Sequence, residues 1–187
     1  MLTLLLAAVV LNIGWGLLIG DGDIENAPIR AQGLRCAPHE PLVLMSQSVP
    51  TASLVPCIEI LPAGWTVGDV VVGNDRSRFT MISDRGGVLV AELTASCDLA
   101  RAVELTSERP EARRYLRIER DAAGVTMTRA YTFPGGCITQ RLVAPEASRQ
   151  QLAGESSFAL GFTTRDALAA AVRRDSGGRL DLNPTAR

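Results

Sequence analysis

Between residues 55 and 143, short strand-like runs alternate with turns rich in glycine, aspartate and proline, and this pattern most limits the possible folds. Leu89, Ala91 and Leu93 alternate with polar residues, as is typical of a strand with one buried face. The last three runs are separated by hairpin-length turns. The pattern predicts an antiparallel sheet of about six or seven strands, drawn from the runs 55–61, 66–72, 78–83, 88–95, 113–120, 125–132 and 137–143.

Two helices are expected after this sheet. Residues 146–158 lack strand alternation and contain good helix formers. Thr163 lies three residues before Asp166, a spacing typical of a capping box at a helix start. Gly177 and Gly178 then offer the left-handed conformation that ends many helices. The expected fold class is therefore α+β, an antiparallel sheet packed with two C-terminal helices.

The first 20 residues contain no charged side chain, and all 19 basic and 20 acidic residues follow them. As a helix they would span roughly 30 Å, the thickness of a bilayer's hydrocarbon core. The alternative, a cleaved signal peptide, is disfavoured because a cut after Gly20 puts Leu18 at the minus-three position. We predict a transmembrane helix at 1–20 that acts as a signal anchor in the lipid bilayer, with secretion after cleavage as the alternative.

The rest of the chain divides into two predicted parts. Residues 21–53 are a proline-rich tether and entry segment, in which a continuous helix is disfavoured. Within this segment, Pro41 to Met45 is interpreted as a short edge strand. Residues 54–183 are the predicted α+β domain.

The four cysteines indicate the cellular compartment in which the domain folds. Their even number and the absence of a C-x-x-C spacing predict two disulfides formed in an oxidising environment. Their wide spacing is unlike the paired ligands of a zinc site. We therefore place the domain of this single-pass cell-membrane protein outside the cytoplasm. The arginines that flank the anchor follow it in the sequence, which by itself would favour a cytoplasmic domain. Three connectivities are possible, and the favoured one pairs Cys36 with Cys57 and Cys97 with Cys137.

The sequence carries no recognisable catalytic motif. His39 is the single histidine, and it follows Pro38 in the entry segment, away from any nucleophile motif. We predict no catalytic residue, no metal site and no cofactor. A carboxylate-dependent envelope hydrolase is kept as an alternative, with five scattered candidates: Glu59, Asp69, Asp84, Glu92 and Asp98.

A basic face is the strongest candidate for binding. Period-two alternation along 113–118 turns Leu116 and Ile118 inward and leaves arginine and tyrosine outside. If the next two strands pair as a meander, threonines and a further arginine join that face. Arginine with hydroxyl groups suits phosphate or carboxylate, so the predicted anionic-ligand face comprises Arg113, Tyr115, Arg117, Thr126, Thr128 and Arg141.

Three segments carry a likeness to a known group. The sequence is CIEILPAGW at 57–65, TFPGGC at 132–137 and GFTTR at 161–165. These segments resemble single-pass envelope proteins of actinobacteria, a group with no known activity to carry over. The resemblance implies a location at the membrane and no chemistry.

Composition narrows the partners. A net charge of -1 and 4% aromatic residues disfavour nucleic-acid binding. The sequence favours a non-enzymatic, membrane-anchored extracytoplasmic domain that binds an envelope polymer or other envelope ligand, or a partner membrane protein. Besides the hydrolase, the other alternative is an accessory subunit of a membrane complex.

Overall fold

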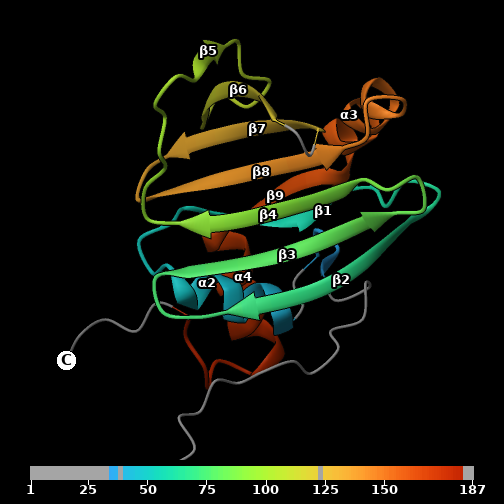
Figure 1. The fold of residues 1–187 in the computed structure, drawn as a ribbon. Helices are drawn as coiled ribbons and strands as arrows, with labels where there is room; N and C mark the ends of the chain where they lie inside the picture. The colour runs from blue at the N-terminus through green and yellow to red at the C-terminus, as the bar shows by residue number, and fades with distance from the viewer. Residues whose placement is uncertain (1–33, 38–39, 122–123, 183–187) are drawn as a thin grey trace, which may run out of the picture.

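Seven strands form one antiparallel sheet in the order β2-β3-β4-β8-β7-β6-β5 (Figure 1). The structure, a computed structural model, describes residues 34–37, 40–121 and 124–182. Six of the seven expected strand runs lie in this sheet, and the short β5 was not expected. The strands are β2 Trp65–Val72, β3 Arg76–Ser83, β4 Val88–Thr94, β5 Val103–Leu105, β6 Arg113–Asp121, β7 Gly124–Phe133 and β8 Gly136–Ala144.

A second layer covers one face of this sheet. It contains the antiparallel pair of β1, Leu54–Ile58, and β9, Leu160–Thr164. The helices α2 (Glu40–Ser48), α3 (Arg149–Ala159) and α4 (Arg165–Asp175) lie on the same side (Figure 1). Among the elements that the structure describes, none covers the opposite face. The α+β class is therefore confirmed.

The core lies between the sheet and this second layer. Phe79, Met81 and Ile138 point from the sheet and are at most 1% exposed. Because successive strand residues face opposite sides, polar neighbours such as Arg78 and Thr80 lie on the uncovered face. Apolar side chains from every helix complete the core, including Leu42, Met45, Leu152 and Leu168.

The edge strand expected at 41–45 is wrong, because these residues lie within helix α2. Pro41 occupies the first turn, where its missing N–H removes no helical hydrogen bond. Leu42 and Met45 lie three residues apart on one face and are fully buried. This part of the proline-rich segment therefore contributes directly to the core.

The C-terminal helices are confirmed, with one change at the start of α4. The expected capping residue, Thr163, is instead in β9, opposite Val55. Thr164 is the cap, and its Oγ1 accepts a 3.1 Å hydrogen bond from the N–H of Ala167. At the other end, Gly178 has a φ of 79°, and its N–H donates to the carbonyl of Arg173 at 2.7 Å. Such 6→1 bonding is typical of a glycine C-cap.

Both disulfides follow the favoured pairing. Cys36 bonds to Cys57, with Cα atoms 5.0 Å apart, and Cys97 bonds to Cys137, with Cα atoms 5.8 Å apart. The first joins the entry segment to β1. It also packs against β9 at Gly161, where a Cβ atom would lie 2.5 Å from the sulfur of Cys36. The second joins the β4–β5 connection to β8.

The predicted membrane anchor at 1–20 and the single histidine, His39, lie outside the described residues. Within the described part of the chain, no helix combines the length and the apolar composition needed to cross a bilayer.

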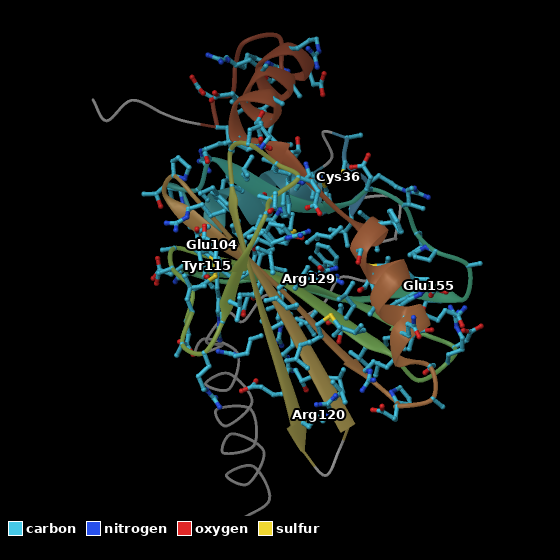
Figure 2. The ribbon with its side chains drawn as sticks, turned by 90° about the horizontal axis from the view of Figure 1, so that it is seen from above. Cys36, Glu104, Tyr115, Arg120, Arg129 and Glu155 are labelled. Atoms are coloured by element: carbon cyan, nitrogen blue, oxygen red, sulfur yellow. A yellow bond between two sulfur atoms is a disulfide. The ribbon has the colours of Figure 1, made fainter. Side chains whose placement is uncertain are left out.

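An ion pair between two half-buried side chains connects α3 to the sheet. Arg85, in the β3–β4 turn, donates two hydrogen bonds to Glu155, at 2.7 and 2.8 Å. The indole N–H of Trp65 donates to the same carboxylate at 2.6 Å. The hydrogen bonds from Arg85, followed by that from Trp65, hold the pKa of Glu155 below its usual value. Glu155 lies on the face of α3 that meets this turn (Figure 2).

Removing the disulfide between Cys97 and Cys137 will destabilise the fold. The bond closes a separation of 40 residues. Replacing both cysteines by alanine should lower the free energy of unfolding by ~2–4 kcal/mol, since the unfolded chain regains freedom. Urea denaturation followed by circular dichroism measures this loss. An unchanged urea midpoint would contradict a formed disulfide.

The Glu155 ion pair will make stability depend on acid. Because folding lowers the pKa of Glu155, its contribution is present above the unfolded value and lost as pH falls through the folded value. We expect Glu155→Gln to lower the melting temperature by a few degrees at pH 7 and by less at pH 3, below the unfolded value. As a control, Glu146→Gln changes the same charge at a side chain that is 69% exposed and should have little effect. If Glu155→Gln lowers the melting temperature by the same amount at both pH values, this role is contradicted.

Candidate anionic-ligand site

The strand register places all six residues of the predicted anionic-ligand face on the uncovered side of the sheet. In β6 and β7, Arg117 lies opposite Thr128. Across β7 and β8, Thr128 lies opposite Arg141. Because side chains alternate along each strand, Arg113, Tyr115 and Thr126 share this face. Figure 1 views the sheet from this side, with the second layer behind it.

Four of the six residues line one depression, which we call the open-face hollow. It has a volume of about 640 Å³. Its lining residues include four arginines, two threonines and one glutamate. This composition gives the hollow a positive charge and hydrogen-bond donors for an anion. The lining residues are Arg101, Arg117, Ile118, Glu119, Arg120, Thr126, Thr128 and Arg141.

One side of the hollow is held by ion pairs. Arg117 is 20% exposed, and its Nη1 lies 3.2 Å from the Oδ2 of Asp98. Glu119 accepts a 2.9 Å hydrogen bond from Arg101 and lies 3.4 Å from the Nε of Arg117. The N–H of Ala100, followed by Arg117, lowers the pKa of Asp98. Arg117 and Arg101 are therefore positioned by carboxylates, which reduces the charge that they offer to a ligand.

Arg141 is the arginine of the uncovered face that no carboxylate of the described residues engages. It lies in β8, whereas Arg120, near the tip of the β6–β7 hairpin (Figure 2), is paired with Val125 and starts on the covered side of the sheet. Both are exposed, and neither forms an ion pair with any residue that the structure describes. Since a threonine lies directly opposite Arg141 in β7, guanidinium and hydroxyl donors point from neighbouring strands. Arg141, with the threonine opposite it, is therefore the part of the hollow most available to an anion.

Arg113 and Tyr115 lie outside the hollow. Arg113 donates to both carboxylate oxygens of Glu104, at 2.9 and 2.7 Å. The Arg113 hydrogen bond lowers the pKa of Glu104. The guanidinium of Arg113 also lies 5.6 Å from the ring centroid of Tyr115. The structure thus gives Arg113 a partner within the chain, in place of the free position expected from the sequence.

The inward residues of β6 are less enclosed than expected. Leu116 is half-buried, but Ile118 is 51% exposed. The sequence missed Arg101, Glu119 and Arg120 as residues of the hollow. Alternation along β6 already places Glu119 beside Arg117, so that residue was accessible to sequence reasoning. Arg101 comes from the β4–β5 connection, whose position depends on the fold.

The carboxylates proposed for a hydrolase do not gather around the hollow. Glu119, its one carboxylate, was not among the five candidates. Asp98 pairs with Arg117, and Asp84 lies 3.2 Å from Arg85. Across the described ranges, no group of three or more histidine, cysteine, aspartate or glutamate side chains is placed to hold a metal ion.

Comparisons with protein-family models, curated proteins and solved structures find no significant match to this chain. The geometry of the described residues therefore carries the functional argument.

Proposed function

We propose that this chain is a membrane-anchored extracytoplasmic domain that binds an anionic envelope ligand in the open-face hollow. The observation that carries the proposal is the exposed Arg141, which forms no ion pair with any described residue and lies opposite Thr128 of β7 on the uncovered face. Guanidinium groups form charge-assisted hydrogen bonds with phosphate and carboxylate oxygens. The open shape suits a polymer or headgroup, which needs contact along a surface without full enclosure.

The location rests on separate support. Two disulfides are typical of proteins that fold in an oxidising compartment. The uncharged first 20 residues have the length and composition of a bilayer anchor. With the domain close to a membrane surface, anionic headgroups and envelope polymers are the nearest abundant anions. The ligand chemistry that unites them is a set of closely spaced phosphate or carboxylate groups.

The test uses the full chain in phosphatidylcholine nanodiscs, titrated with soluble poly(glycerol phosphate). We expect saturable binding that weakens at high salt, because salt screens exposed charges. Arg141→Glu should raise the dissociation constant at least about tenfold, since a favourable guanidinium contact becomes repulsive. The matched control is Arg76→Glu, an exposed arginine of the same face in β3, which lies outside the hollow.

A second variant should act in the opposite direction. Glu119→Gln removes the one carboxylate of the hollow and should strengthen polymer binding several-fold. Glu104→Gln makes the same charge change on the same face outside the hollow and should have a smaller effect. Discs that contain phosphatidylglycerol should suppress polymer binding if lipid headgroups occupy the hollow. Equal weakening by Arg76→Glu and by Arg141→Glu would overturn the proposed site.

A further inference from the structure

A second hollow lies on the opposite side of β6 and β7, between these strands and the α3–β9 segment. We call it the Arg129 cleft. It has a volume of about 490 Å³, within the range of small-molecule sites. Figure 2 shows Arg129 on the α3 side of the sheet, opposite Tyr115 and Glu104. The cleft is lined by Leu105, Glu108, Arg109, Arg114, Leu116, Arg129, Tyr131, Ser157, Phe158, Leu160 and Phe162.

The guanidinium of Arg129 is enclosed without a counter-ion. It donates to the side-chain oxygen of Gln140 at 3.2 Å, to the hydroxyl of Ser156 at 3.2 Å and to the carbonyl of Ala153 at 3.1 Å. All three acceptors are neutral, and Arg129 forms no ion pair within the described part of the chain. Burial lowers the pKa of Arg129, which reflects the cost of a desolvated charge. An anion in the cleft would offset that cost.

Two more arginines stand around the same space. Arg114 pairs with Glu108, but its Nε is buried without a hydrogen-bond partner among the described residues. Arg109 has its guanidinium 4.5 Å from the ring centroid of Phe162. Three guanidinium groups therefore face one carboxylate, and that carboxylate is 70% exposed. The basic end of the cleft retains a positive charge that the protein itself does not neutralise.

The remaining wall of the cleft is apolar. The rings of Tyr131 and Phe162 pack edge to face, with centroids 4.9 Å apart. Phe158 projects from α3 and is 71% exposed, although it borders the cleft. Leu105 in β5 is 37% exposed, and it borders the same space. An exposed aromatic ring beside enclosed arginines is what a ligand with both an apolar part and a charge requires.

We propose that the Arg129 cleft binds an amphiphilic organic anion, with its carboxylate or phosphate headgroup at Arg109, Arg114 and Arg129 and its apolar chain or ring against Phe158 and Leu105. This site is distinct from the open-face hollow, because the two lie on opposite faces of the sheet. The hollow offers charge and hydroxyl groups to a polyanion. The cleft combines charge with aromatic and aliphatic surface, which selects a single small molecule.

The experiment titrates the full chain in phosphatidylcholine nanodiscs with 6-phenylhexanoate, using empty discs as the blank. We expect saturable one-to-one binding by isothermal titration calorimetry. Two further probes separate the parts of the ligand: 6-phenylhexan-1-ol lacks the charge, and acetate lacks the apolar body. Both should bind at least about tenfold more weakly. A 6-phenylhexyl phosphate then distinguishes a phosphate headgroup from a carboxylate.

Variants test the assignment without removing the internal hydrogen bonds of Arg129. Arg109→Gln should weaken the binding of 6-phenylhexanoate about tenfold and leave the weak binding of the alcohol unchanged. Phe158→Ala changes an exposed side chain and should weaken both probes several-fold. Arg141→Gln is the matched control, because it removes the same charge in the hollow and should leave the cleft unaffected. Arg109→Gln should in turn leave poly(glycerol phosphate) binding unchanged.

Several results would overturn the proposal. They are absence of saturable binding, equal affinity for the alcohol and the carboxylate, or unchanged binding in both Arg109→Gln and Phe158→Ala. The melting temperature of each variant, compared with that of the unmodified chain, shows that the fold is retained. If the unmodified chain binds 6-phenylhexanoate but not poly(glycerol phosphate), the open-face hollow alone is contradicted.

Discussion

The position of both candidate sites depends on one constraint: the covering layer of helices and short strands is narrower than the large sheet. The seven-stranded sheet is wider than the layer of β1, β9 and three helices that covers it, and that layer packs against β2, β3, β4 and β8. Covered strands can bury apolar side chains, whereas β5 and β6 extend beyond this layer and present more exposed ones, such as Val103 and Ile118. The open-face hollow spans β6, β7 and β8, and the Arg129 cleft lies where β5, β6 and β7 meet the α3–β9 segment. The fold therefore separates a stabilising half from a half free to bind ligands.

Arg129 lies at the boundary between these halves. Its hydrogen bonds reach Gln140 in β8 and Ser156 in α3, so it links β7 to the covering layer. The amide of Gln140 donates to the carbonyl of Ser156 at 2.5 Å and is itself buried. This polar connection holds α3 at a defined distance from the sheet. The same connection keeps a charge at the base of the Arg129 cleft.

Sequence reasoning predicted the features that depend on local pattern. Strand alternation located six strands of the large sheet, and cysteine spacing favoured the disulfide pairing that the structure contains. It missed α2 because Pro41 was taken as a helix breaker, although proline is favoured in a first helical turn. It missed β9 because its partner, β1, lies about 100 residues earlier. The alternation that places Thr128 on the open face also places Arg129 on the covered face, and this signal could have indicated the cleft.

The disulfide between Cys36 and Cys57 determines how tension would travel through the molecule. A pull applied at the N-terminal side reaches Cys36 and passes through the sulfur atoms directly to β1. Helix α2, which lies between the two cysteines, is thereby excluded from the load path. The force falls instead on the hydrogen bonds between β1 and β9. A pull from the N-terminal side would therefore load the β1–β9 pair and leave α2, the first helix of the described residues, intact.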